Sequence, residues 1–182
     1  MTTLVQWSRD ELAIRRDDVL AVYADAMGVP PSVAQGRRSI ITAHLERRGL
    51  RTVAAMTGQR TLVGIAYGYL GAPGQWWHDQ VRAALTGAQA GRWLDGSFEV
   101  CELHVRQAVQ RTGLGRRLLE QLLAGPPAPT ATLTTPDAET RARSFYRAGG
   151  WVDLARDLIF PGDPRAFAVL AKDLAPRDSA DA

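Results

Sequence analysis

The segment between Val105 and Arg116 has the residue types that bind an anion. It contains Gly113 and Gly115 and leads directly into a leucine-rich run with the spacing of an amphipathic helix. Backbone N–H groups at such a helix start, together with the positive end of the helix dipole, favour phosphate. A dinucleotide fingerprint would need a glycine in place of Leu118, and a Walker loop would need a lysine followed by Ser or Thr. A plain turn is the alternative interpretation.

Two carboxylates precede this turn, Glu99 and Glu102, in the run Phe98–Val105 that predicts a strand. Because they are three residues apart, a regular strand directs them to opposite faces, and His104 then shares the face of Glu102. Either carboxylate could accept a proton. A bulge in the strand would change the face to which each side chain points. The alternative interpretation for either residue is a carboxylate that lies on the surface or in a salt bridge. Cys101 is predicted to be a small core residue.

The elements that position these residues follow from periodicity, caps and turn residues. The order predicts a mixed α/β fold in which helices cover a mixed sheet. The predicted elements are helices over Ser8–Ala26 and Ser32–Arg48, strands over Arg51–Met56 and Thr61–Leu70, a short inserted helix between Gly71 and Gly96, a strand over Phe98–Val105, a helix over Gly113–Ala124, a strand over Ala131–Thr134, a helix over Asp137–Ala148 capped by Asp137, and strands over Val152–Phe160 and Phe167–Leu170.

Length and composition limit the classes of protein. The 182 residues suit a single domain over residues 1–174, followed by a polar tail, 175–182, that we expect to be disordered. The single cysteine excludes an internal disulfide and suits a reducing cytoplasm. No apolar run is long enough to span a membrane, and the first residues lack the pattern of a signal peptide.

The positive charges come almost entirely from arginine and are interspersed with acidic residues. The sequence pI is about 9.5, but the formal net charge is only +3, and Lys172 is the only lysine. Arginine suits forked contacts with phosphate, so a phosphorylated small ligand is at least as natural a partner as nucleic acid. We therefore expect no nucleic-acid partner, and a nucleic-acid-binding module remains an alternative supported only by the pI.

Three segments resemble the GNAT (Gcn5-related N-acetyltransferase) superfamily. The run Gln110–Gly115 resembles its Gln/Arg-x-x-Gly-x-Gly/Ala signature, and Glu99–Val105 resembles its fourth strand. Ala142–Trp151 resembles its late Ala-x-x-Phe-Tyr-x-x-x-Gly-Phe segment, with Trp151 in place of the usual Phe. The resemblance covers about residues 4–172. It implies a mostly antiparallel mixed sheet flanked by helices, with a helical insertion between strands three and four.

The resemblance implies transfer of an acetyl group from acetyl-CoA to a primary amine of a small molecule or peptide, in a ternary complex and without a metal. Backbone groups of Leu103, His104 and Val105 would pair with the pantetheine arm, and Phe145 would also contact the cofactor. Glu139 stands where many members carry an Asn that contacts the cofactor, so that contact is not carried over. The predicted pyrophosphate cradle consists of Gln110, Arg111, Thr112, Gly113, Leu114, Gly115 and Arg116.

The resemblance also assigns an acid and a base. Tyr146 aligns with the family tyrosine that faces the CoA sulfur, and a phenol, with a reference pKa of about 10, is protonated at neutral pH. Its alternative role is packing. Glu99 matches a position where several members keep a catalytic Glu, so we prefer it to Glu102 as the base, and water alone is a further alternative.

The acceptor pocket is the least determined part. Tyr23 on the first helix and Trp77 and His78 in the insertion lie where similar proteins shape that pocket, although core packing is the alternative for each. A second function is a catalytically inactive acyl-CoA-binding sensor, which would bind the cofactor without turnover. Neither the acceptor amine, the acyl-chain length nor the choice between monomer and homodimer follows from the sequence.

Overall fold

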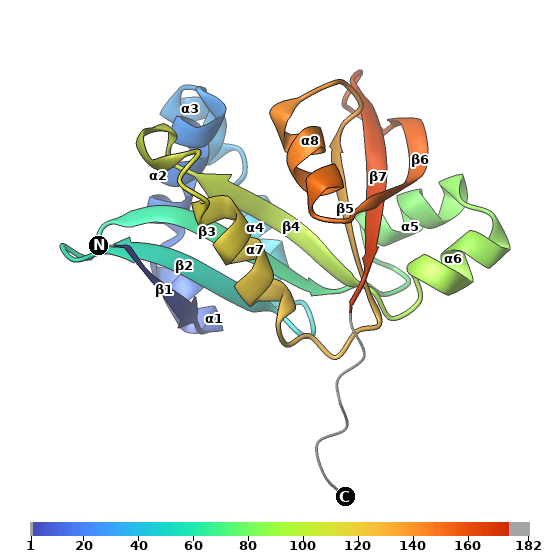
Figure 1. The fold of residues 1–182 in the computed structure, drawn as a ribbon, viewed down its shortest axis with the longest axis horizontal. Helices are drawn as coiled ribbons and strands as arrows, with labels where there is room; N and C mark the ends of the chain where they lie inside the picture. Colours follow the sequence, from blue (N-terminus) through green and yellow to red (C-terminus); the bar gives the residue numbers. More distant parts are fainter. Residues whose placement is uncertain (1, 175–182) are drawn as a thin grey trace, which may run out of the picture. The chain divides into compact units, whose positions relative to one another are not determined.

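The computed structural model describes residues 2–174, which form a mixed α/β fold with a seven-stranded sheet flanked by helices (Figure 1). The strand order is β1-β2-β3-β4-β5-β7-β6, with β4 and β5 parallel. The pairs β1/β2, β2/β3, β5/β7 and β6/β7 are antiparallel, which confirms the predicted fold class. The elements are β1 (Thr2–Trp7), α1 (Arg9–Ile14), α2 (Arg16–Met27), α3 (Pro31–Gln35), α4 (Arg38–Leu45), β2 (Arg51–Thr57), β3 (Leu62–Leu70), α5 (Trp76–Ala84), α6 (Gly87–Trp93), β4 (Phe98–Val105), η1 (Gln107–Val109), α7 (Leu114–Leu123), β5 (Thr130–Pro136), α8 (Arg141–Ala148), β6 (Val152–Ile159) and β7 (Ala166–Asp173).

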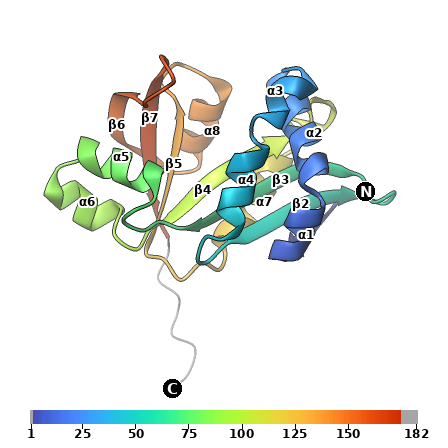
Figure 2. The same ribbon diagram turned by 180° about the vertical axis from the view of Figure 1, so that it is seen from behind.

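The described residues form two compact units, and the first consists of residues 2–70 and 100–126. In this unit α1, α2 and α4 cover one face of β2 and β3, and α7 covers the other (Figures 1 and 2). Leu12, Leu20 and Ile65 are among the buried side chains of its core. Gly64 on β3 lies close to α7, since a Cβ there would lie 2.9 Å from Leu118 Cδ1.

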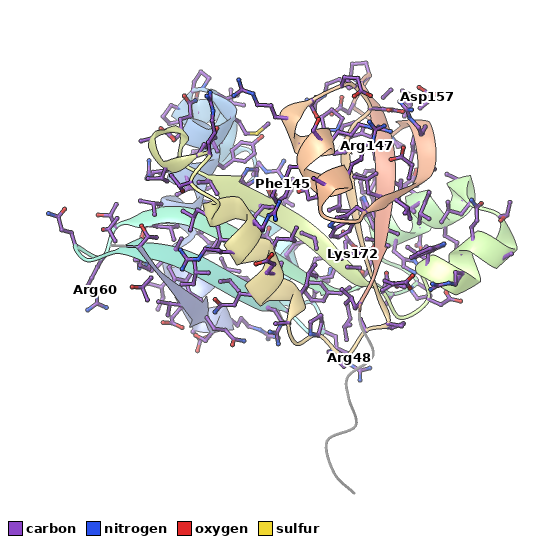
Figure 3. All side chains as sticks on the ribbon, viewed as in Figure 1. Arg48, Arg60, Phe145, Arg147, Asp157 and Lys172 are labelled. Atoms are coloured by element: carbon purple, nitrogen blue, oxygen red, sulfur yellow. The ribbon has the colours of Figure 1, made fainter. Side chains whose placement is uncertain are left out.

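The second unit consists of residues 71–99 and 127–174. In it α8 contacts β5, and Val81 of α5 packs with Leu94, Phe160 and Val169 in a buried cluster. Lys172 on β7, labelled in Figure 3, donates a hydrogen bond of 2.6 Å to the carbonyl of Gly149, just after α8. No helix among residues 2–174 is long and apolar enough to cross a membrane.

The N-terminal region differs from the prediction in two ways. A strand, β1, precedes the helices, and each predicted helix is divided in two. Five of the six side chains of β1 are at least partly exposed and only Trp7 is buried, so the apolar pattern of a strand is weak there. The first helix breaks at Arg15, whose φ of −98° and ψ of 22° are not helical, and the second breaks between α3 and α4.

The predicted cap at Asp137 is wrong. Helix α8 begins at Arg141, and the Thr140 side chain caps it by accepting a hydrogen bond of 3.1 Å from the Arg143 N–H. Asp137 instead accepts hydrogen bonds from Arg143 and Arg156, and these charge-assisted contacts hold it in the turn before the helix. The inserted segment between β3 and β4 has two helices, the second begun by a capping box at Thr86, rather than one.

Candidate functional site

The loop from β4 to α7 is held by its own polar side chains. The Gln110 side-chain amide donates to the Val105 carbonyl at 3.0 Å, and the Thr112 hydroxyl donates to the Val109 carbonyl at 2.8 Å. The preceding turn is tied to α2, because the carboxylate of Asp25 accepts a hydrogen bond of 2.7 Å from the Gln107 N–H. The loop is therefore a defined structure.

The end of this loop presents donors to an anion. Gly113 is the N-cap of α7 with φ of +81°, a conformation that favours glycine, and no side chain caps the helix there. The N–H groups of Leu114, Gly115 and Arg116 belong to the first turn, which has no intrahelical partners, whereas Arg117 N–H already bonds to the Gly113 carbonyl at 3.1 Å. Arg116 is exposed beside them, as is Arg111. These donors and charges fit a pyrophosphate group.

The resemblance implies that this segment binds acetyl-CoA, and replacing Gly113 by valine is expected to weaken that binding about 10- to 100-fold, the loss of one charge-assisted hydrogen bond. Valine at a φ of +81° is strained, so the loop must shift and misalign the N–H groups. Isothermal titration calorimetry measures the change. Gly162→Val is the control, because Gly162 has a φ of +89° with equally open surroundings but lies in the β6–β7 turn. Equal affinity in Gly113→Val and wild type would exclude this loop as the segment that binds the pyrophosphate.

A buried carboxylate lies beside this loop in sequence, on β4. Glu102 is 6% exposed and is bonded on both oxygens, Oε1 to the Arg37 guanidinium and Oε2 to His104 Nε2 at 2.5 Å. The Tyr23 ring meets the His104 ring edge-on, with centroids 5.1 Å apart. The Arg37 guanidinium stacks over the same Tyr23 ring at 4.8 Å. Four side chains from β4, α2 and the start of α4 thus form one connected polar group.

The regular alternation assumed for β4 does not hold at residues 101 and 102. Cys101 packs against the core beneath α1, α2 and α4, as predicted for a small core residue, and the adjacent Glu102 also contacts groups from this helical side. The parity argument that separated Glu99 from Glu102 therefore fails within the strand.

The polar group keeps Glu102 ionised. Burial alone would raise the Glu102 pKa, but the hydrogen bond from His104 and the charge of Arg37 outweigh burial and lower it below 4.5. Burial would lower the pKa of Arg37, and the charge of Glu102 raises it instead. The Tyr67 pKa is raised well above 10.0 by burial and by Glu102. Glu102 is therefore an anion that only accepts hydrogen bonds.

His44 on α4 extends this group to β3. Its Nδ1 lies 3.1 Å from the Tyr67 hydroxyl, and its ring packs edge-on against Tyr69 at 5.0 Å between centroids. Burial, aided by the charges of Arg47 and Arg37, lowers the pKa of His44 to about 4. The imidazole is therefore neutral in the folded chain at neutral pH.

The low pKa of His44 makes stability depend on pH. Its folded pKa of about 4 lies below the ordinary 6.5, so the unfolded chain takes up the proton first and stability falls as the pH drops from 6.5 towards 4. We expect a loss of about 2 kcal/mol after allowance for partial exposure. Urea unfolding at pH 7 and pH 4.5 should show this loss in wild type and a smaller one in His44→Gln. An equal loss in both proteins would contradict it.

The second unit holds the predicted residues from the start of β4, the insertion and α8. Glu99 is 5% exposed in the part of β4 that pairs with β5. Tyr146 on α8 is half-buried, and its ring packs edge-on against Phe145 and Trp151 with centroids 5.1 and 5.6 Å away. Phe145 is labelled on α8 in Figure 3.

The two candidates in the insertion differ in exposure. Trp77 is half-buried and donates from Nε1 to the Thr134 hydroxyl at 3.3 Å. His78 is 1% exposed, beside Gly71, so its position is that of a core side chain.

Three acidic residues of the first two helices have structural partners. Glu11 forms a capping box with Ser8, Asp17 pairs with Arg38, and Asp18 pairs with Arg15. A groove of about 480 Å³ lies between α2, α3 and Gln107. Its lining combines two carboxylates with small apolar side chains, from Asp17, Leu20, Ala21, Ala24, Asp25, Gly28, Val29, Pro31, Ala34, Gln35 and Gln107.

Of the residues predicted from the sequence, the structure brings Tyr23, Glu102 and His104 into one group, and it places Gln110–Arg116 in the end of a loop and the first turn of α7. Arg37, His44 and Tyr67 were not predicted as site residues. Arg37 meets Glu102 across 65 positions of sequence, a separation for which local spacing carries no signal. Among residues 2–174, no group of three or more His, Cys, Asp or Glu side chains could hold a metal ion.

Known proteins resemble this chain in sequence and in fold. No protein-family model matches the chain. A GCN5-like protein acetyltransferase of Mycobacterium tuberculosis is 34% identical over 94% of this chain and 97% of its own length.

Two solved structures share the fold over nearly the whole chain. A proposed GNAT-family acetyltransferase from Desulfovibrio desulfuricans has a TM-score of 0.68 at 16% identity, with 96% of this chain and all of that one covered. The ribosomal-protein-S18-alanine N-acetyltransferase of Escherichia coli has a TM-score of 0.59 at 14% identity, and both chains are covered completely.

Proposed function

Because this chain belongs to the GCN5-related N-acetyltransferase family, we propose that it transfers an acetyl group from acetyl-CoA to a primary amine of a small molecule or peptide. The proposal is supported by the segment Gln110–Arg116, in which the uncapped start of α7, the left-handed Gly113 and two exposed arginines offer donors and charges suited to a pyrophosphate. Of the relatives, the E. coli protein is named for acetylation of an alanine amine.

In this proposal the chain binds and orients acetyl-CoA through the backbone. The N–H groups of residues 111–116 would hold the pyrophosphate, and the backbone of Leu103, His104 and Val105 would pair with the pantetheine arm. Such positioning lowers the barrier because the thioester and the amine meet as parts of one complex. A backbone N–H of β4 would polarise the thioester carbonyl as charge develops on its oxygen.

The reaction forms an N–C bond and breaks a C–S bond, so one proton must leave the amine and one must reach the departing sulfur. Tyr146 is proposed to donate to the sulfur. Glu99 and Glu102 are the carboxylates predicted to serve as the base. Glu102 is already bonded on both oxygens, to Arg37 and His104, which favours another role for it.

We propose residues 1–174 as one acetyltransferase domain that acts in the cytoplasm with acetyl-CoA and an amine as its partners. The single cysteine agrees with a reducing compartment. The proposal involves no nucleic acid, membrane or metal.

The test is a free-thiol assay with acetyl-CoA and a panel of amines that includes N-terminal dipeptides, lysine peptides and small diamines. Amine-dependent release of CoA by wild type, lost in Gly113→Val, supports the proposal. Binding of acetyl-CoA without release of thiol for any amine would favour the inactive acyl-CoA-binding sensor instead.

A further inference from the structure

The contacts of Glu102 point to a proton acceptor other than a carboxylate, and this inference rests on the proposed function. We propose that His104 is the catalytic base and that Glu102 is its positioning residue. The imidazole takes the proton of the attacking amine, and the buried carboxylate fixes the ring and stabilises the imidazolium. This pairing follows from the side chains of the first unit and deepens the proposed activity.

The tautomer of His104 follows from its partner. The pKa of Glu102 is lowered, so its carboxylate only accepts hydrogen bonds, and the contact of 2.5 Å between Oε2 and His104 Nε2 requires the hydrogen on Nε2. The lone pair of the neutral ring is then on Nδ1. When Nδ1 takes a proton, the positive ring faces an ionised carboxylate, the arrangement of a carboxylate–histidine pair in nucleophilic enzymes.

Glu102 is poorly suited to take the proton itself. Its side chain is 6% exposed, and its second oxygen is held by Arg37. Protonating it would leave the Arg37 guanidinium facing a neutral acid. The histidine ring is more accessible, at 14% exposed, and lies on the strand whose backbone is proposed to pair with pantetheine.

An aromatic neighbour also packs against the histidine ring. Tyr23 on α2 meets it edge-on at an interplanar angle of 86°, and Arg37 covers the same tyrosine ring. The charged and titratable groups around His104 are therefore Glu102 on β4, Arg37 at the start of α4 and Tyr23 on α2, with His44 on α4 and Tyr67 on β3 in contact with the same network.

In the proposed step, the proton moves from the amine nitrogen to Nδ1 as the N–C bond forms. The C–S bond breaks with its electron pair on sulfur, and that sulfur takes a proton from Tyr146. The imidazolium then releases its proton to solvent, and the tyrosine recovers one, so both groups return to their starting state.

The test is the pH dependence of kcat for His104→Gln, Glu102→Gln and Arg37→Gln, divided by that of wild type so that the ionisation of the amine cancels. Removing the carboxylate makes the imidazolium less stable and should move the acidic limb to lower pH. Removing Arg37 should move it to higher pH. His104→Gln should lose the acidic limb of the kcat profile and lower kcat at neutral pH by about 100-fold or more. Glu99→Gln is the competing arm and should keep the limb.

A second measurement does not need turnover. The chain has three histidines, so NMR of labelled imidazoles, assigned with His44→Gln, His78→Gln and His104→Gln, follows His104 directly. The nitrogen shifts should place the hydrogen of the neutral His104 ring on Nε2 in wild type and divide it between both nitrogens in Glu102→Gln. The same tautomer in Glu102→Gln as in wild type, or a limb lost in Glu99→Gln but kept in His104→Gln, would overturn the pairing.

The two proposals fail differently. Wild type that binds acetyl-CoA and acetylates no amine overturns the proposed function, and the proton step with it. Wild type that is active while His104→Gln keeps the acidic limb overturns only the role of His104. A loss of stability in His104→Gln with an unchanged acidic limb of the kcat profile also overturns the role of His104 as the base. A purely structural role would not move that limb.

Discussion

Replacing Arg143 by methionine is expected to lower the free energy of unfolding by about 3–5 kcal/mol, the loss typical of breaking a buried ion pair from one side. The Arg143 side chain is fully buried and bridges two carboxylates, with Nη1 2.7 Å from Asp137 Oδ1 and Nη2 2.6 Å from Asp153 Oδ2. Methionine has similar bulk but no charge, so both carboxylates lose this buried cation. Urea unfolding followed by circular dichroism at pH 7 measures the change.

Arg147→Met is the matched control, since Arg147 lies one turn later on α8. Its side chain is 42% exposed and pairs with Glu139 and Asp153 at 3.4 and 3.7 Å, so we expect a loss below about 1 kcal/mol. Figure 3 labels Arg147 on this helix. Equal losses in the two variants would show that the buried bridge does not hold α8 in place.

Asp137 makes the same network sensitive to acid. Hydrogen bonds from Arg156 and from the backbone N–H of Asp157 lower its pKa to about 2. Its contribution to stability is complete above the ordinary pKa of 3.8 and is lost as the pH falls from there towards 2.

Replacing Tyr146 by phenylalanine is expected to lower kcat by about 100-fold or more, the range of a general acid. Phenylalanine keeps the ring that packs against Phe145 and Trp151, so stability and acetyl-CoA affinity should be unchanged. Steady-state kinetics measured with the best amine from the panel, together with calorimetry for acetyl-CoA, separates the two effects.

Trp151→Phe is the control for packing, because it changes the neighbour of Tyr146 without removing the hydroxyl. It should lower stability and leave kcat within a few-fold of wild type. If Tyr146→Phe retains the wild-type kcat, the tyrosine is a packing residue and the departing sulfur takes its proton elsewhere.

The sequence best predicted the part of the candidate site that is formed by backbone groups. The turn Gln110–Gly115 could be predicted because a left-handed residue at a helix start favours glycine, and Gly113 has that conformation. The helix that follows was equally clear, since Leu118 and Leu122 are spaced for one buried face. Local rules determine such features, so local sequence reveals them.

Long-range polar contacts could not be predicted in the same way. Arg37 was placed within an uninterrupted helix, yet it stands at the break before α4 and meets Glu102 from there. Asp137 has the residue type of a helix cap, and a cap would have been worth about 1 kcal/mol. The bonds to Arg143 and Arg156 prevailed because they neutralise a buried carboxylate, and only the folded chain brings those partners together.

The most direct test of acetyl-CoA dependence is a thermal-shift titration of wild type with acetyl-CoA and with CoA, with ATP as the control. Binding to the folded state at a hundred times the dissociation constant stabilises it by about 2.7 kcal/mol. We expect a concentration-dependent rise in Tm with both CoA species, little change with ATP, and a much smaller rise in Gly113→Val. An unchanged Tm at millimolar acetyl-CoA would contradict the account and leave the family fold without its cosubstrate.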